Sequence, residues 1–172
     1  MVKRTEDGRL CITDERLGAF ILSLEKESDR ALVIIVGTVL EERLKKILNE
    51  FLIQNKESHV FIGRNLGCLE ALNRAVFCMG LISHWEYRFI NRIRILRNSF
   101  AHQFIDKGFD GTLEAKKAEV FGMLAEFMPG HDRNAFETSR AAFQELAVNI
   151  TWTIWERSYE IGASKSVAHE RD

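Results

Sequence analysis

The sequence predicts an all-α protein of about six helices, and three observations lead to that fold class. A single proline, Pro129, interrupts 172 residues, and β-branched residues rarely alternate with polar ones. Apolar residues recur instead at spacings of three and four, as they do on one face of a helix. A hydrophobic fraction of 46% over this length suits one globular domain with a core of its own. We therefore expect a single-domain helical bundle.

Composition limits the classes of function. A net charge of −1 and a pI near 6.5 give no overall basic excess to drive non-specific nucleic-acid binding. The longest apolar run, residues 31–36, is far shorter than the roughly 20 residues of a membrane span. Cys11, Cys68 and Cys78 lack the spacing of a metal site, so we expect three reduced, mostly buried thiols. We expect a cytoplasmic protein that uses no membrane, metal or cofactor.

The expected domain spans residues 13–161, between a flexible arm at residues 1–12 and a flexible tail at residues 162–172. Either Thr13 or Asp14 can cap a first helix, because both side chains can accept a hydrogen bond from the first turn. That helix carries an apolar face made of Leu17, Phe20, Ile21 and Leu24.

The second predicted helix is the longest of the N-terminal half. Ser28 or Asp29 caps it, and it reaches about Gln54. Its first turns are apolar on every side, which predicts a place at the centre of the core. Gly37 lies inside this helix and costs about 1 kcal/mol relative to alanine. A close crossing by another helix explains a glycine there.

A polar stretch at residues 55–65 predicts a loop. Leu66 to Met79 then form a third helix, and Gly80 ends it because glycine readily adopts the left-handed conformation of a helix C-cap. The fourth helix begins immediately afterwards. Ser83 followed three residues later by Glu86 is the pattern of a capping box.

The C-terminal part predicts two more helices after a linker at residues 107–111. The fifth helix runs from Thr112 to Met128 and is stopped by the Pro-Gly pair that follows. The sixth is long, from Asp132 to about Tyr159, with an apolar stripe that includes Leu146, Ile150 and Ile154.

The fourth helix carries the candidate functional site at its end. Asn91, Arg94, Asn98 and His102 are separated by three or four residues, so they share one face, and Arg97 lies about 100° to its side. The predicted binding residues are therefore Arg94, Arg97, Asn98 and His102. Buried polar groups are costly without partners, so this cluster has either structural partners or a chemical role.

The chemistry of these side chains suits phosphate. Arginine offers bidentate, permanently charged donors, and an imidazole can transfer protons near neutral pH. Metal-free RNA cleavage needs one group to deprotonate the 2′-hydroxyl and another to stabilise the charged phosphorane. His102 and Arg97 are the candidates for those roles, next to Asn98.

Two structural interpretations stand beside this one. Arginine, asparagine and histidine at a helix end can bond loop carbonyls, and His102 near a helix C-terminus gains from the dipole. Alternatively, Arg97 reaches Glu41 or Glu42 of a second copy in a symmetric dimer.

Several stretches together resemble the bacterial mannitol operon repressor family, over about residues 28–125. The resemblance implies an all-helical domain that represses mannitol uptake and use without a helix-turn-helix of its own. The stretches are Ser28-Asp29-Arg30-Ala31, Val39-Leu40-Glu41-Glu42-Arg43-Leu44, Leu66-Gly67, Gly80-Leu81-Ile82-Ser83, Glu86-Tyr87, Ile93-Arg94 and Leu96-Arg97-Asn98-Ser99-Phe100-Ala101-His102.

The helical core also resembles HEPN domains, whose hallmark is an arginine, four to six residues, and then a histidine. Arg97, Asn98 and His102 match that pattern. Some HEPN proteins are toxin ribonucleases whose site forms across a dimer, whereas others bind nucleotides or partners without cleaving.

Together these readings predict a repressor that acts through another regulatory protein and forms a homodimer. We expect no sequence-specific DNA binding by the chain alone, and we assign no catalytic residue. The alternative is a metal-independent endoribonuclease that uses Arg97, Asn98 and His102 and binds RNA.

Overall fold

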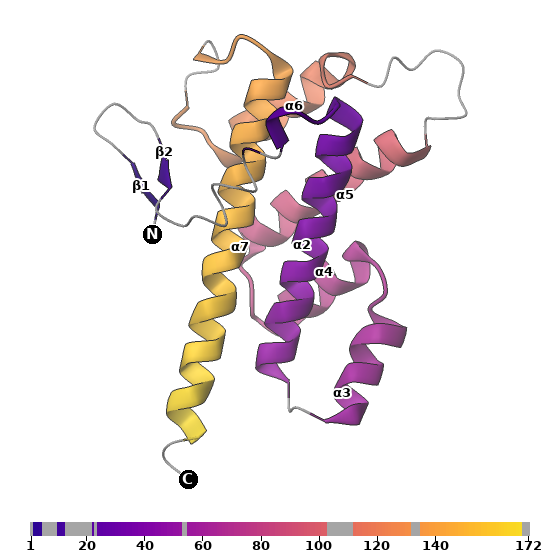
Figure 1. Ribbon diagram of the computed structural model, residues 1–172, viewed down its shortest axis with the longest axis vertical. Helices are drawn as coiled ribbons and strands as arrows, with labels where there is room; N and C mark the ends of the chain where they lie inside the picture. The colour runs from indigo at the N-terminus through magenta and orange to yellow at the C-terminus, as the bar shows by residue number, and fades with distance from the viewer. Residues whose placement is uncertain are drawn as a thin grey trace.

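The computed structural model describes residues 2–4, 10–12, 22, 24–52, 55–102, 112–131 and 135–169. These residues form a single helical bundle, which confirms the predicted all-α fold class (Figure 1). The α-helices are α2 (Asp29–Phe51), α3 (Lys56–Val60), α4 (Leu69–Cys78), α5 (His84–His102), α6 (Lys117–Phe127) and α7 (Ser139–His169), with a π-helical turn η1 (Phe61–Asn65) and a 3₁₀ turn η2 (Glu114–Lys116).

The bundle is organised around α2, which packs against α7, α5 and α4. Figure 1 shows α2 and α7 as the two long helices of the molecule. Ser28 caps α2, because its hydroxyl oxygen accepts from the N–H of Ala31 at 3.2 Å. The expectation that α2 lies at the core centre is confirmed, since these of its residues are buried: Leu32, Val33, Val36, Gly37, Leu40, Leu44, Ile47 and Leu48.

The turn between α4 and α5 follows the sequence prediction. Gly80 has a φ of 72°, in the left-handed region, and the N–H of Leu81 donates to the carbonyl of Val76 at 2.9 Å. Ser83 and Glu86 form the predicted capping box: the N–H of Ser83 donates to Glu86 Oε2 at 2.5 Å, and the N–H of Glu86 donates to Ser83 Oγ at 3.2 Å. These caps fix where α5 starts and therefore the positions of its side chains.

The predicted loop at residues 55–65 is wrong, because the segment is helical. Asn55 caps α3, with its Oδ1 accepting from the N–H of Ser58 at 2.9 Å. The π-helical turn η1 follows directly and buries Ile62. The short segment has no apolar periodicity, so its capping residue was its only sequence signal.

The last helix also differs from its prediction. It begins at Ser139 rather than Asp132, and Thr138 caps it by accepting from the N–H of Ala141 at 3.1 Å. It continues past Tyr159 to His169, so its backbone is helical over much of the segment expected as a tail.

The remaining expectations concern the N-terminal arm, the cysteines, the first helix, the linker and membrane spans. Within the expected arm, strand β1 (Val2–Arg4) pairs antiparallel with strand β2 (Leu10–Ile12). Cys68 and Cys78 are free thiols, but they are exposed rather than buried. Most of the first predicted helix and the linker at residues 107–111 lie outside the described residues. Among the described helices, none has the length and apolar character needed to cross a membrane.

Arg140 near the start of α7 ties four chain segments together. Its guanidinium pairs with Asp29 at 2.5 Å and donates to the carbonyls of Leu24 at 2.9 Å and Glu27 at 2.7 Å. Asp29 Oδ2 in turn accepts from the N–H of Leu113 at 2.8 Å. Every bond in this cluster joins residues far apart in the sequence. The cluster therefore holds the start of α2 against the start of α7 and against the segment that precedes α6.

We expect substitution of Glu86 to destabilise the fold. Its carboxylate is buried, caps α5 and pairs with Arg157 of α7 at 3.2 Å. Glu86→Ala leaves the N–H of Ser83 without that acceptor and should cost about 2 to 3 kcal/mol in urea unfolding. Glu160→Ala removes an exposed partner of the same arginine and should change stability by less than about 0.5 kcal/mol. Equal losses in the two variants would contradict this account of the cap.

A second prediction concerns pH. Hydrogen bonds from Lys117 and then Ser139 lower the pKa of Glu114 below its ordinary value of 4.5. The carboxylate therefore stabilises the folded state above that ordinary value, and the contribution is lost as pH falls through the lowered pKa of the folded chain. Glu114→Gln should flatten this part of the acid limb in melting temperatures measured against pH. An unchanged acid limb would show that the two hydrogen bonds contribute nothing.

Candidate functional site

Asn91, Arg94 and Asn98 lie on one continuous helix, because α5 runs without interruption from His84 to His102. Ile93, Leu96 and Phe100 point into the core and are buried. Asn91 and Arg94 lie on the side away from this apolar stripe and are partly exposed, and Asn98 is exposed. The backbone of His102 ends the helix, while its imidazole lies outside the described side chains.

Arg97 crosses α2 at Gly37. A Cβ atom added at Gly37 would lie 2.5 Å from Cδ of Arg97, so only glycine leaves room for this side chain. The guanidinium then reaches Glu41, with Nη1 3.5 Å from Oε2. Lys45 contacts the other oxygen of Glu41 at 2.9 Å. The sequence analysis explained Gly37 by a close crossing of another helix, and in the structure it is the side chain of Arg97 from α5 that lies against Gly37.

Arg94 is held by a second carboxylate, which comes from a different helix. Its Nε donates to Asn91 Oδ1 at 3.0 Å, and its Nη1 lies 3.0 Å from Glu70 Oε2 on α4. Arg74 contacts the other oxygen of Glu70 at 2.8 Å. Each arginine of the candidate site is thus paired with a glutamate that also serves a second cation.

The two remaining arginines of α5 are also paired. Arg88 and Arg92 both contact Glu126 of α6, Arg92 at 3.3 Å. All four arginines of this helix therefore have a carboxylate partner within the same chain. Because four guanidiniums share three glutamates, α5 keeps a small positive excess.

Sequence reasoning found the cations of this site and missed or misplaced the anions. One of the structural alternatives placed Arg97 against Glu41 or Glu42 of a second copy, whereas in the structure Arg97 contacts Glu41 of its own chain. Glu70 and Glu126 were not predicted, because nothing in the sequence brings α4 and α6 to α5. The one available signal was local: Glu70 and Arg74 have the spacing of a pair on one helix.

A metal ion and a phosphate group would need different side chains at this site. Among the described residues, no group of three histidine, cysteine, aspartate or glutamate side chains could hold a metal ion. Both site arginines are about one quarter exposed, so their guanidiniums remain reachable from solvent. A phosphate ligand would have to compete with Glu41 and Glu70 for them.

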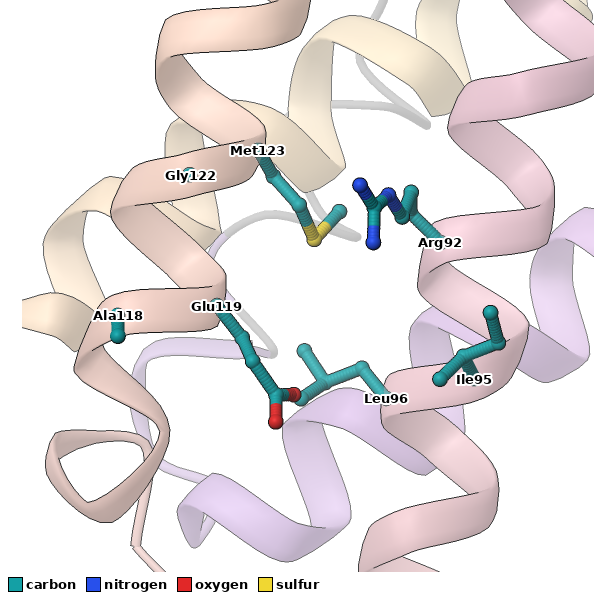
Figure 2. Close-up of a pocket in the computed structure, with 7 residues that line it drawn as sticks. All are labelled: Arg92, Ile95, Leu96, Ala118, Glu119, Gly122 and Met123. Carbon is teal, nitrogen blue, oxygen red and sulfur yellow. The ribbon is translucent and has the colours of Figure 1, made fainter.

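A separate cavity lies between α5 and α6, on another face of α5. Its volume is about 330 Å³. Figure 2 shows Arg92 and Ile95 of α5 on one side and Glu119, Gly122 and Met123 of α6 on the other. This cavity was not predicted from the sequence.

Comparison with known proteins identified no relative of this chain. No protein-family model matches the chain, and neither a curated protein nor a solved structure matches it. The class that the structure defines is therefore an all-α, single-domain bundle with an ion-paired arginine helix.

The contact between Gly37 and Arg97 predicts a change of sign in a double-mutant cycle. Gly37→Ala alone should destabilise the protein by about 1 kcal/mol, because the new methyl group displaces Arg97 from Glu41. In an Arg97→Ala background the same change should stabilise it by up to about 1 kcal/mol, the helix preference of alanine. Chemical unfolding of the four proteins measures both effects. If Gly37→Ala has the same sign in both backgrounds, Arg97 is not what requires the glycine.

Proposed function

We propose that this protein is a cytoplasmic transcriptional regulator, a repressor of the mannitol operon repressor kind, that acts by contact with another regulatory protein. The proposal takes the regulated pathway from the resemblance of residues 28–125 to that family. The single observation that supports a protein contact over a nucleic-acid contact is the pairing of every arginine on α5 with a glutamate of the same chain.

That observation bears directly on DNA reading. Helices α4 and α5 are joined through Gly80, as in a helix-turn-helix, and α5 carries four arginines. A recognition helix needs free cations and an exposed face for the major groove. In α5 the cations are paired, and one face is buried against α2. The net charge of −1 gives no compensating attraction to phosphate.

The second candidate is a HEPN-type ribonuclease that uses Arg97, Asn98 and His102. One observation favours it: α5 is continuous through His102, so the spacing of the motif is kept on one helix. Asn98 is exposed, and the guanidinium of Arg97 is held in place by Glu41. Pairing with a carboxylate weighs against it, because Arg97 would have to leave Glu41 to stabilise a phosphorane.

Two assays on the purified full chain separate these functions. The first mixes it with DNA from the control region of a mannitol operon, and we expect no sequence-selective shift at about 0.15 M salt. The second incubates it with single-stranded RNA and a chelator, and we expect no cleavage. Deleting the gene in its host should raise the transcripts of the mannitol operon, and supplying the chain in trans should lower them again.

Three results would contradict the proposal. Sequence-selective DNA binding with a steep salt dependence would identify a DNA reader. RNA cleavage lost in both Arg97→Ala and His102→Ala, with unchanged melting temperatures, would identify the ribonuclease. Arg74→Ala is the matched control, because this arginine is also paired on the surface but lies outside the motif. Transcripts that do not respond to deletion would remove the regulatory role itself.

A further inference from the structure

We infer that the groove between α5 and α6 is a docking surface for a second copy of this chain. The groove is lined by Arg92, Ile95, Leu96, Ala118, Glu119, Gly122 and Met123. Its place on the molecule differs from the polar face of α5, because the residues 92 and 95 lie to one side of the stripe that carries Arg94 and Asn98.

Gly122 is the first observation that points to a contact from outside. It lies in the interior of α6, where glycine is unfavourable relative to alanine. A Cβ atom at this position would meet nothing within 4 Å, so no packing among the residues that the structure describes requires the glycine. At Gly37, by contrast, an added Cβ atom would lie 2.5 Å from Cδ of Arg97. A bare backbone facing open space suits the close approach of another molecule.

Exposed apolar side chains on α5 supply the second observation. Ile95 is 45% exposed at the groove. Trp85, at the N-terminal end of the same helix, is 39% exposed. Both lie on the face that also carries Arg88 and Arg92, and they extend the surface over about 15 Å of the helix. Trp85 is anchored edge-on against Phe89 at 5.3 Å, so it presents a rigid ring rather than a mobile one.

The arrangement of charges identifies the occupant as a second copy. In Figure 2 Arg92 and Glu119 lie at opposite corners of the groove, while Gly122 and Ile95 occupy the other two corners. We place a second copy face to face with this groove, related to the first by a two-fold axis that runs from Gly122 to Ile95. This axis exchanges the two charged corners. Arg92 of each copy then meets Glu119 of the other, glycine meets glycine, and isoleucine meets isoleucine. The surface is therefore complementary to itself, as a symmetric dimer contact requires.

The ion pairs within the chain allow this exchange. Arg92 shares Glu126 with Arg88, so Glu126 keeps a partner when Arg92 turns to the second copy. Glu119 is half exposed and contacts Lys116 at 3.2 Å, a surface pair of three-residue spacing. Such pairs contribute little to stability and are easily replaced. This inference is independent of the proposed function, because self-association can be measured whether or not the protein regulates transcription.

Sedimentation velocity of the full chain tests the glycine contact. We expect a dimer in the micromolar range. Gly122→Gln places a side chain in the groove without a clash in the monomer and should weaken dimerisation at least tenfold, with an unchanged or higher melting temperature. Gly130→Gln is the matched control, because a Cβ atom there also meets nothing within 4 Å but lies outside the groove. It should leave the dimer intact.

Charge reversal tests the predicted pairing itself. Arg92→Glu and Glu119→Arg should each weaken self-association at least tenfold, since each places like charges at both corners. An equimolar mixture of the two variants should form heterodimers, because each corner then holds one glutamate and one arginine.

Three outcomes would overturn the inference. A wild-type chain that stays monomeric at high micromolar concentration excludes the contact. A dimer that survives Gly122→Gln uses another surface. Charge variants that are monomeric alone and remain monomeric after mixing exclude the two-fold arrangement of Arg92 and Glu119.

Discussion

The close approach of α5 to α2 at Gly37 is the constraint on which the rest of the site depends. Without a Cβ atom at Gly37, the stem of Arg97 lies across α2, and its guanidinium reaches Glu41 one turn further on. Ile93, Leu96 and Phe100 of the same helix are buried in the core. The missing methyl group at Gly37 therefore leaves room for the stem of Arg97 beside a helix that also contributes to the core.

The sequence predicted the fold where the signals were local. Ser28, Gly80 and the Ser83–Glu86 pair act within a few residues, and the structure confirms each of them as a cap. The signals failed where an element was short or its boundary was weak. The segment at 55–65 has no apolar period, and the last helix begins after Thr138 rather than at Asp132, because a long apolar stripe does not define its own start.

The candidate site also has one part that could be predicted from the sequence and one part that could not. Arg94, Arg97 and Asn98 could be placed together from their spacing on one helix, since that spacing depends only on helix geometry. Their partners Glu41 and Glu70 come from α2 and α4, and Glu126 comes from α6. Which helices pack together depends on tertiary structure, so the sequence suggested Glu41 only as a contact from a second copy and did not indicate Glu70 or Glu126. Yet the carboxylates decide whether the arginines are free for phosphate.

These pairings leave α5 with three different sides. One side is buried in the core, and a second carries arginines that are already matched by Glu41 and Glu70. The third side combines exposed Ile95 and Trp85 with the groove beside Gly122 and with Glu126, which is shared by two arginines of α5. Apolar area that is exposed and flanked by charge gains most from contact with another protein. The side of α5 without the sequence motif is therefore the one whose physical chemistry most favours association.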